Sequence, residues 1–574
     1  MTVRPWFDHY DAGVAHTLVP YPEQTLLDLL AENARAHPDH PITYMKGRAM
    51  SYAELDRLSD ACAAAFAALG VRPGDRVAIG LPNIPQFLIA EFGAWKAGAI
   101  VCPFNPTYTD HELEDALRAT EAGWVIVLNR HYEKVKRVQS RTNLGRVITT
   151  NVKEFLPPLL AVAFTLLKEK KAGDRITLRD GDVRFSELLA RYRGVAPPPV
   201  TVSAGDPAVI LMSGGTTGTP KGVVGRHGGM TIAGRQLQAW LRPAMKEWTD
   251  TIMLPLPLFH TYGNTGVQGL ALINHNPIVL IPDPRDIADL LSEIQRTKPA
   301  FICAVPTLLS GIMAHPRTSA GKVSFRSIKL CFSGAAPLMA ETKRRWEQLT
   351  GGVVVEGYSL TEAQMAVIAN PVLGEKKIGS VGMPLPDVDV RIVDPDAGDR
   401  ELGIGETGEI TISAPQLMEG YWRRDDETRL MLRTNAAGRR VLYTGDLGYV
   451  DTDGYVFLVD RKKDLVKTSG YQVWPREVEE VITSHPAVAE CGVAGLPDAA
   501  RGEILKAWIV LRPGMSVTPD ELKAFCRETL APYKVPSRWE FVSELPKSAI
   551  GKVLRRKLRE RELDGSKPTV AVIS

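Results

Sequence analysis

The chain has 574 residues, of which 44% are hydrophobic and 24% are charged, and its formal net charge is +3. These are ordinary values for a soluble globular protein, and the length predicts at least two domains because one hydrophobic core rarely serves so many residues. No long basic run precedes the C-terminal end, so we expect no nucleic-acid partner.

Cysteine spacing and targeting signals point to the cytoplasm. The six cysteines include no C-x-x-C pair, which favours packing roles in a reducing compartment over disulfides or zinc. Residues 1–22 lack a signal-peptide pattern, and the C-terminus matches no common address signal. The most apolar run, 155–167, is shorter than the roughly 20 residues that cross a bilayer.

Helix and strand signals alternate over the first 350 residues or so. In chain order they are a helix capped by Ser51 and ending at Gly70, a strand at 76–81, a helix at 85–97, a strand at 99–103 and a helix capped from Thr109 to Glu112. This alternation predicts doubly wound α/β layers with mostly parallel sheets.

The pattern of secondary-structure signals changes near Gly379, where short β-rich runs separated by Gly, Pro and Asp begin. These runs predict a small β-barrel or sheet up to Asp460. After the charged break at 460–464, strands near 488–493 and 507–511 and a helix from Pro519 to about Leu530 predict a compact α+β tail. We therefore predict a large N-terminal domain at 1–460 and a C-terminal domain at 461–574.

The apolar strand 208–212 leads into Ser213-Gly-Gly-Thr-Thr-Gly-Thr-Pro-Lys-Gly222. The glycines let backbone N–H groups turn towards an anion, the threonine hydroxyls add donors, and Lys221 adds a mobile positive charge. A Walker A loop would end in Gly-Lys-Ser/Thr, so this is a different kind of loop. Its composition alone leaves two alternatives open, a phosphate-binding loop and a flexible surface turn.

The same stretch resembles the signature of the acyl-adenylate-forming superfamily, which includes acyl-CoA synthetases, adenylation modules of peptide synthetases and beetle luciferases. The family usually has Ser where Gly214 stands, so one hydroxyl is missing. Six further segments, from about Tyr21 to Arg556, resemble family motifs in the family's order. They include Pro255–Gly263, Ser333–Leu338, Glu356–Glu362, Tyr443–Asp446, Lys467–Pro475 and Pro546–Lys552.

The resemblance implies roles for individual residues. His260 would lie beside the acyl carboxylate, Thr361 would hydrogen-bond the α-phosphate, and Glu362 would help to coordinate Mg²⁺. Lys552 and Lys221 would supply positive charge during catalysis. The residues assigned to ATP and CoA are Ser213, Thr216, Thr217, Gly218, Gly334, Ala335, Ala336, Tyr358, Ser359, Thr361, Asp446, Arg461, Lys463, Lys467, Gly470 and Gln472.

Within that set, Tyr358 would stack on adenine and Asp446 would accept both ribose hydroxyls, as an acceptor-only carboxylate can. Taken alone, His260 fits a core histidine better, and an Asp in a tight turn such as Asp446 is common. The basic stretch 555–561 is expected to be a solvated helix.

The implied reaction has two halves. A carboxylate attacks the α-phosphorus of ATP and releases pyrophosphate, and the thiol of coenzyme A then attacks the acyl-AMP and releases AMP. No covalent nucleophile is required, which agrees with the absence of a Ser/His/Asp or Cys/His pattern. In the family's scheme the mobile C-terminal domain rotates about Lys463, so that Lys552 serves the first half and Gly470 the second.

Several segments resemble bacterial long-chain fatty acid–CoA ligases in particular. They are Pro5–Phe7, Asn105–Tyr108, Asp283–Ile287, Gly420–Trp422, Val459–Asp464 and the Gly-Gly form of the phosphate loop. The substrate expected from this resemblance is a long-chain fatty acid. Peripheral contact of 155–171 with the inner face of the membrane, a helix packed on its own domain, and a homodimer all remain open.

Other functions share these motifs. A medium-chain or aryl acid–CoA ligase and transfer to a carrier-protein thiol use the same first half-reaction, and a luciferase-like oxygenase would carry every motif. A nucleotide-binding protein without catalysis is the alternative from another class. Glu362, Asp446, Arg461 and Lys552 are all present, which argues against it because decay should affect such residues first.

Overall fold

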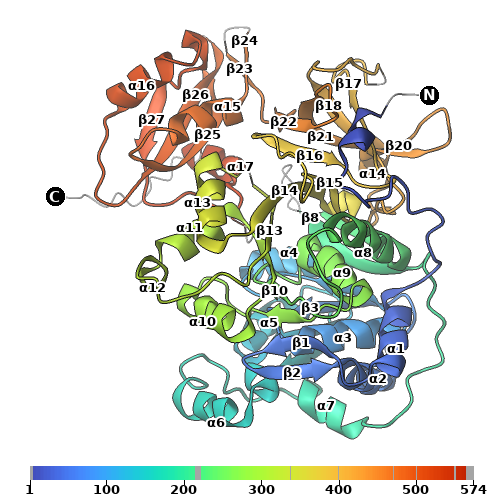
Figure 1. Cartoon of the computed structure of the whole chain (residues 1–574). Helices are drawn as coiled ribbons and strands as arrows, with labels where there is room; N and C mark the ends of the chain where they lie inside the picture. The colour runs from blue at the N-terminus through green and yellow to red at the C-terminus, as the bar shows by residue number, and fades with distance from the viewer. Residues whose placement is uncertain are drawn as a thin grey trace. The chain divides into compact units, whose positions relative to one another are not determined.

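The computed structural model describes residues 4–213, 221–336, 338–398, 400–468, 471–498, 501–548 and 551–563. The chain divides into two compact units. The large unit comprises Met1–Asp389 and Ser413–Leu442, and the small unit comprises Val390–Ile412 and Tyr443–Ser574. Figure 1 follows the chain through both, from blue at the N-terminus to red at the C-terminus.

One sheet of the large unit carries the hairpin that encloses the predicted phosphate loop. Its order is β19 (Gly420–Tyr421), β9 (Lys221–Arg226), β8 (Pro207–Ser213), β4 (Ile100–Pro103), β3 (Arg76–Gly80), β5 (Trp124–Leu128), β6 (Arg146–Thr150) and β7 (Val183–Arg184). Neighbouring strands from β8 to β7 run parallel, whereas β9 is antiparallel to both β8 and β19.

A second sheet carries the other predicted nucleotide motifs of this unit. Within the unit its order is β16 (Ser380–Pro384), β15 (Met365–Ala369), β14 (Val353–Leu360), β13 (Leu330–Ser333), β12 (Phe301–Ala304), β10 (Ile252–Leu254), β11 (Ile278–Leu280), β1 (Pro41–Met45) and β2 (Arg48–Ser51). Strands β14 to β1 are parallel.

Helices pack against strands of both sheets (Figure 1). Those of the large unit are α1 (Leu26–Ala36), α2 (Tyr52–Ala68), α3 (Pro85–Lys96), α4 (Asp110–Thr120), α5 (Tyr132–Gln139), α6 (Pro158–Leu167), α7 (Phe185–Arg191), α8 (His227–Leu241), α9 (Gln268–Ile273), α10 (Ile287–Thr297), α11 (Pro306–Ala314), α12 (Pro316–Ser319), α13 (Ala340–Thr350) and α14 (Asp425–Met431). Helix α3 is buried along almost its whole length and packs on α2, where a Cβ at Gly93 would lie 2.5 Å from the Cys62 Sγ. The close approach of α3 to α2 at Gly93 explains why the apolar helix α3 contains a glycine.

The local signals of the sequence are confirmed in these elements. Ser51 caps α2 by accepting the Glu54 N–H, and Thr109 forms a reciprocal capping box with Glu112 at the start of α4. The predicted alternation of helices and strands, and its mixed α/β character, are also confirmed.

The small unit contains the β-rich region and the tail. Strands β17 (Asp389–Val393), β18 (Gly408–Ser413), β21 (Arg440–Val450) and β22 (Val456–Arg461) form one run, and closure into a barrel remains a prediction. The tail has a sheet ordered β24 (Tyr471–Val473), β23 (Val466–Thr468), β26 (Gly502–Leu511) and β25 (Val488–Asp498), with β27 (Arg538–Phe541) beside β26. Helices α15 (Pro475–Thr483), α16 (Pro519–Arg527) and α17 (Arg555–Leu563) complete the predicted α+β tail.

The cysteines take the packing roles expected of them, since all six are buried and none forms a disulfide. Within the described part of the chain, no helix is long and apolar enough to cross a membrane.

Candidate active site

The predicted phosphate loop joins two antiparallel strands. Ser213, the last residue of β8, lies opposite Lys221, the first residue of β9, and the Ser213 hydroxyl donates a hydrogen bond of 3.3 Å to the Lys221 carbonyl oxygen. Residues 214–220 lie outside the described residues, and with them the predicted ligands Thr216, Thr217 and Gly218. The two described ends are thus held together at the carboxyl end of β8.

Lys221 lies in a small polar cluster. Its ammonium group forms an ion pair with Glu427 of α14 and lies 5.0 Å from the centre of the Tyr421 ring. The Tyr421 hydroxyl donates a hydrogen bond of 2.8 Å to Glu362 Oε1. Tyr421 therefore connects the cation of the predicted phosphate loop to the predicted metal ligand.

The ionisation of this cluster follows from its contacts. The hydrogen bond from Lys221 lowers the pKa of Glu427, so this carboxylate is charged at neutral pH. Burial, and after it the negative charge of Glu362, raise the pKa of Tyr421, so its hydroxyl stays protonated and donates. The pair of Lys221 and Glu427 keeps the loop cation neutralised until another anion competes for it.

Glu362 is suited to a divalent ion of the kind that accompanies a nucleotide. Among the described residues, no group of three or more His, Cys, Asp or Glu side chains could hold a metal ion by itself. Mg²⁺ in nucleotide sites is usually held by one or two carboxylates together with phosphate oxygens, which does not require such a group. A single half-buried carboxylate beside the phosphate hairpin fits that arrangement.

The predicted adenine contacts lie at the ends of the parallel strands β13 and β14. Gly334, Ala335 and Ala336 directly follow β13, and Ala335 has the left-handed φ of 68° that a tight backbone turn requires. A Cβ at Gly334 would lie 3.4 Å from the Gly357 carbonyl oxygen, so the two strands approach closely here. Tyr358 and Ser359 follow on β14, and Tyr358 is buried.

Thr361 and Glu362 begin the short helix η5 (Thr361–Ala363) directly after β14. Tyr358, Thr361 and Glu362, which are predicted to contact adenine, the α-phosphate and Mg²⁺, therefore lie at close positions on β14 and the turn after it.

His260 precedes the π-helix Tyr262–Val267. Its Nδ1 accepts a hydrogen bond of 3.3 Å from the Tyr262 N–H, and burial lowers its pKa to about 4. The ring is therefore neutral at pH 7, and because Nδ1 accepts, Nε2 carries the proton. This half-buried histidine can donate one hydrogen bond to a carboxylate but does not act as a cation.

In the small unit, Asp446 of β21 and Arg461 of β22 are opposite each other. Asp446 Oδ1 and Arg461 Nε are 3.0 Å apart, and Asp446 is buried. The charges of Asp446 and Arg461 both act on Lys552. Its side chain is exposed, yet the surrounding protein and the Arg461 guanidinium lower its pKa to about 8, while Asp446 acts in the opposite direction.

The turn that carries Lys552 is anchored by the residue three positions later. Arg555 donates two hydrogen bonds to Glu479, of 2.9 and 2.5 Å, one of 2.8 Å to Asp460 and one of 3.1 Å to Asp464. The expectation that 555–561 is only a solvated helix is therefore wrong at its first residue. The Arg555 side chain is 18% exposed and paired with three carboxylates, so it is not a solvated surface arginine.

The other predicted residues of the tail that the structure describes lie in a turn and on a pair of strands. Lys463 is exposed in the turn from Arg461 to Asp464, which is closed by a backbone hydrogen bond. Lys467 of β23 lies opposite Gln472 of β24 in register, and Gly470 lies outside the described residues.

Three residues that the structure places in these clusters, Tyr421, Glu427 and Glu479, are not among the predicted site residues. Tyr421 belongs to a segment used only for its resemblance, and Glu427 stands in an acidic run at the start of a helix, which by itself suggests a favourable helix N-terminus. Glu479 gives no signal at all, because a glutamate on an amphipathic helix is usually solvated.

Comparison with known proteins places the chain in a family. The sequence profile of the AMP-binding enzyme matches residues 30–422, and that of the AMP-binding enzyme C-terminal domain matches residues 477–552. The chain belongs to the AMP-binding enzyme family. The superfamily expected from the phosphate-loop motif is thereby confirmed.

Among AMP-binding enzymes, the long-chain-fatty-acid–CoA ligase of Bacillus subtilis is 36% identical over 567 residues, covering 98% of each chain. The crystal structure of ATP-bound MatB from Rhodopseudomonas palustris matches with a TM-score of 0.78 at 29% identity, covering 95% of this chain and 100% of that one. The anthranilate CoA ligase AuaEII in complex with anthranoyl-AMP matches with a TM-score of 0.81 at 26% identity, covering 95% and 99%.

Proposed function

We propose that this AMP-binding enzyme is an ATP-dependent acid–CoA ligase that activates a long-chain fatty acid as acyl-AMP, releases pyrophosphate, and then transfers the acyl group to coenzyme A with release of AMP. The observation that carries the proposal is the cluster of Lys221, Tyr421 and Glu362 at the phosphate-loop hairpin. It occurs in a chain that aligns end to end with a long-chain-fatty-acid–CoA ligase.

The first half-reaction brings anionic groups together, so its main requirement is fixed positive charge and hydrogen-bond donors. Lys221 leaves Glu427 and binds the departing phosphates, and Ser213 and Thr361 add hydroxyl donors. Glu362 would hold Mg²⁺, which when bound neutralises phosphate charge. Removing one such electrostatic contact commonly lowers the rate by about 100- to 1000-fold.

The carboxylate is oriented by His260 and Lys552 in this proposal. The neutral His260 ring donates its Nε2 proton to one carboxylate oxygen and leaves the other free to attack. Lys552 supplies its positive charge at the attacking and bridging oxygens. Tyr358 and the turn 334–336 hold the adenine, and Asp446 with Arg461 holds the ribose.

The second half-reaction uses other residues of the tail. We place the domain division between 460 and 461, with Lys463 at the hinge, so that the domain 461–574 presents Lys552 for the first half-reaction and Lys467, Gly470 and Gln472 to coenzyme A for the second. The exposed position of Lys463 in a short turn supports a hinge there.

The test separates the two halves. Pyrophosphate release is measured with ATP, Mg²⁺ and acids from C2 to C18 plus aromatic acids, and thioester formation is measured separately from supplied acyl-AMP and coenzyme A. Lys552→Ala should abolish the first activity and retain the second. Lys547→Ala, on the same turn and paired with Glu490 at 2.6 Å, is the matched control and should retain both. Equal loss of both activities in Lys552→Ala would contradict the division of labour.

An aryl acid is the second candidate substrate, because the AMP-binding enzyme AuaEII matches with the higher TM-score of 0.81 and is an anthranilate CoA ligase. The acid panel decides between them. A kcat/KM for aromatic acids above that for C14 to C18 acids would replace the long-chain assignment, and failure of coenzyme A to accept the acyl group would favour a carrier-protein thiol.

A further inference from the structure

Helix α6 (Pro158–Leu167) exposes an apolar face. None of its residues is buried, and five large apolar side chains are exposed. The exposed fractions are 85% for Leu159, 43% for Leu160, 58% for Val162, 74% for Leu166 and 77% for Leu167. Leu159, Val162 and Leu166 are spaced as i, i+3 and i+7, so they lie along one side of the helix.

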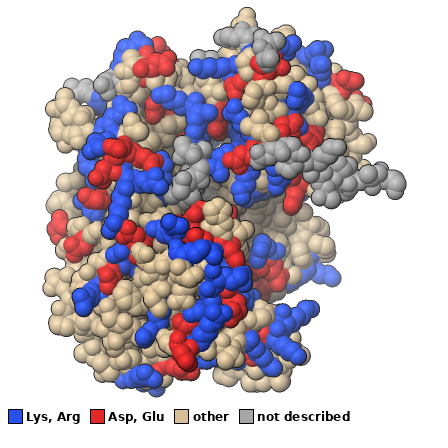
Figure 2. Space-filling view, turned by 180° about the vertical axis from the view of Figure 1, so that it is seen from behind, with Lys and Arg blue, Asp and Glu red and all other residues tan. Residues whose placement is uncertain are grey.

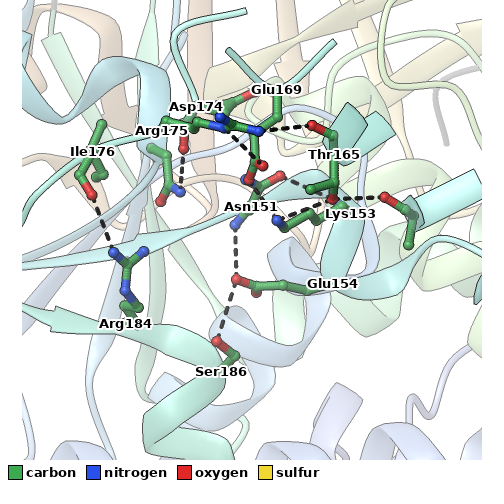
Figure 3. Close-up of polar contacts among 12 residues, drawn as sticks. Asn151, Lys153, Glu154, Thr165, Glu169, Asp174, Arg175, Ile176, Arg184 and Ser186 are labelled. Atoms are coloured by element: carbon green, nitrogen blue, oxygen red, sulfur yellow. Dashed lines mark hydrogen bonds and ion pairs between the residues drawn. The ribbon is translucent and has the colours of Figure 1, made fainter. Parts of the chain in front are cut away.

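The side of α6 that faces the protein is only partly buried and consists of the small or single large side chains of Ala161, Ala163, Phe164 and Thr165, so the larger share of the leucines points to solvent. Thr165 accepts a hydrogen bond of 3.3 Å from the Lys153 ammonium group, and its carbonyl oxygen accepts one of 3.2 Å from Arg175 (Figure 3). A surface helix normally packs its apolar side against the core, so the solvent-facing leucines of α6 are not explained by folding of this domain.

A buried polar network holds α6 in this orientation. Glu169, just after the helix, forms an ion pair of 2.6 Å with Lys153 and accepts a hydrogen bond of 3.0 Å from Asn151 (Figure 3). Five residues later, Asp174 is buried and pairs with Arg130 at 2.5 Å. The exposed apolar face is therefore built on a fixed base and is not a frayed end.

The charges beside the face are of one sign. The acidic residues of 158–175 are Glu169 and Asp174, and both are buried and paired. The basic residues of this range are all exposed. Those basic residues are Lys168, Lys170, Lys171 and Arg175. Elsewhere, Figure 2 shows basic and acidic side chains intermingled over the face in view, and the net charge is only +3, so attraction to an anionic surface has to come from a local cluster such as this one.

We propose that α6 and Lys168, Lys170 and Lys171 form a site that docks the protein on an anionic membrane surface, with the leucines in the interfacial region and the ammonium groups against lipid headgroups. Exposed apolar side chains beside a cluster of lysines bind such surfaces through burial of apolar area and through attraction to anionic headgroups. The site is independent of the proposed catalytic activity, because none of its residues has a role there.

A second copy of this chain fits the face less well than a membrane does. A symmetric pair of α6 helices would bring the lysine clusters of both copies together. Five exposed side chains also present on the order of a few hundred Å², which is less than the roughly 800 Å² per partner of a stable interface.

The test is co-sedimentation of the full-length protein with vesicles of phosphatidylcholine alone or with 40% phosphatidylglycerol. The wild type should bind the anionic vesicles and be released by 0.5 M NaCl. Leu159→Ser/Leu166→Ser/Leu167→Ser and, separately, Lys168→Gln/Lys170→Gln/Lys171→Gln should each weaken partitioning by about tenfold or more. The matched control replaces Leu373, Ile378 and Ile404, exposed at 60–78%, by Ser and should bind like the wild type.

A Leu159→Trp variant gives a second readout that does not depend on loss of binding, since its fluorescence should shift to the blue with anionic vesicles. Absence of wild-type binding, or equal binding by the serine variant and the control, would overturn the proposal. A dimer in sedimentation velocity that the serine variant loses would overturn it in favour of a second copy.

Discussion

The anchoring of the Lys552 turn leads to a prediction whose size can be worked out from the structure. Arg555 makes four hydrogen bonds to three carboxylates, and its side chain is 18% exposed, compared with 2% for its partner Asp460. Arg555→Met keeps most of the length and packing of the side chain but removes the charge, so the carboxylates of Asp460 and Glu479 are left without their common cation.

Removing one partner of a buried ion pair typically costs about 3–5 kcal/mol. Because Asp460 keeps hydrogen bonds of 2.7 Å from the N–H groups of Arg461 and Arg476, we expect a loss of about 2–4 kcal/mol. The matched control is Arg556→Met. Arg556 pairs with Glu560, one helical turn away on the surface, and such a pair contributes about 0.3–0.5 kcal/mol.

The pH dependence provides a second check. Burial already raises the pKa of Glu479, and Arg555 opposes that rise. Without Arg555 the folded protein favours the protonated form of Glu479 still more, and a group with a raised folded-state pKa loses its stabilising contribution as pH rises. The stability difference between Arg555→Met and wild type should therefore be smaller at pH 5 than at pH 8.

The measurement is hydrogen–deuterium exchange of the full-length protein, read on peptides of β25 and β26 so that the small unit is followed by itself, with urea unfolding as a global check. Adenylation should fall as well, because the turn bearing Lys552 loses its anchor. The reasoning would be refuted if Arg555→Met lost no more than about 0.5 kcal/mol of stability beyond Arg556→Met. It would also be refuted if the stability difference between Arg555→Met and wild type grew towards pH 5.

Three further predictions concern single charges. Glu427→Gln removes the carboxylate that competes with phosphate for Lys221, so the KM for ATP should fall by about two- to fivefold. The control Asp426→Asn, on the same helix, should leave this KM unchanged. A rise in the KM of Glu427→Gln would show that Glu427 orients the lysine instead. Lys552 has a pKa of about 8, so pyrophosphate release should decline as pH rises through 8, and Lys552→Arg, however slow, should lack this decline; an unchanged profile would contradict the assigned charge. Glu91 accepts a hydrogen bond of 2.7 Å from the Asn264 side chain, and burial raises its pKa to about 8. The wild type therefore loses stability as pH rises from about 4.5 to 8. Glu91→Gln should gain on the order of 1–3 kcal/mol relative to wild type between pH 6 and 9 in urea unfolding, and parallel pH profiles would count against it.

Much of the fold could be predicted from local signals. The caps at Ser51 and Thr109 mark helix starts because side-chain oxygens satisfy backbone N–H groups that have no preceding helical carbonyl to bond to. The strands around Val101 and Val209 could be predicted as buried, but their pairing as neighbours could not, since more than a hundred residues separate them and periodicity carries no information about partners.

The candidate site could be predicted only as far as its motifs extend. Lys221 lies in a loop whose composition allows phosphate binding, and Glu362 lies in a segment whose resemblance to a family motif implies metal binding. Tyr421, which connects them, and Glu427, which neutralises Lys221, come from an edge strand and helix that the fold brings to β9. Arg555 was misjudged for the same reason, because its three carboxylate partners come from a strand end, a turn and a helix up to 95 residues away.

The ion pair of Lys221 with Glu427 and the ion pairs of Arg555 with its three carboxylates differ in how easily the partners can separate. Among the described residues, Lys221 forms one ion pair, with Glu427, and the two side chains are exposed at 17% and 28%, so an incoming phosphate group has a single carboxylate to displace. Arg555 is held by three carboxylates, one of them almost fully buried, and separating it would leave several uncompensated charges. A pair of the first kind suits a loop that must change partners in every turnover. A pair of the second kind suits the role proposed for Lys552, which requires a fixed geometry of its turn if the C-terminal domain moves as a body.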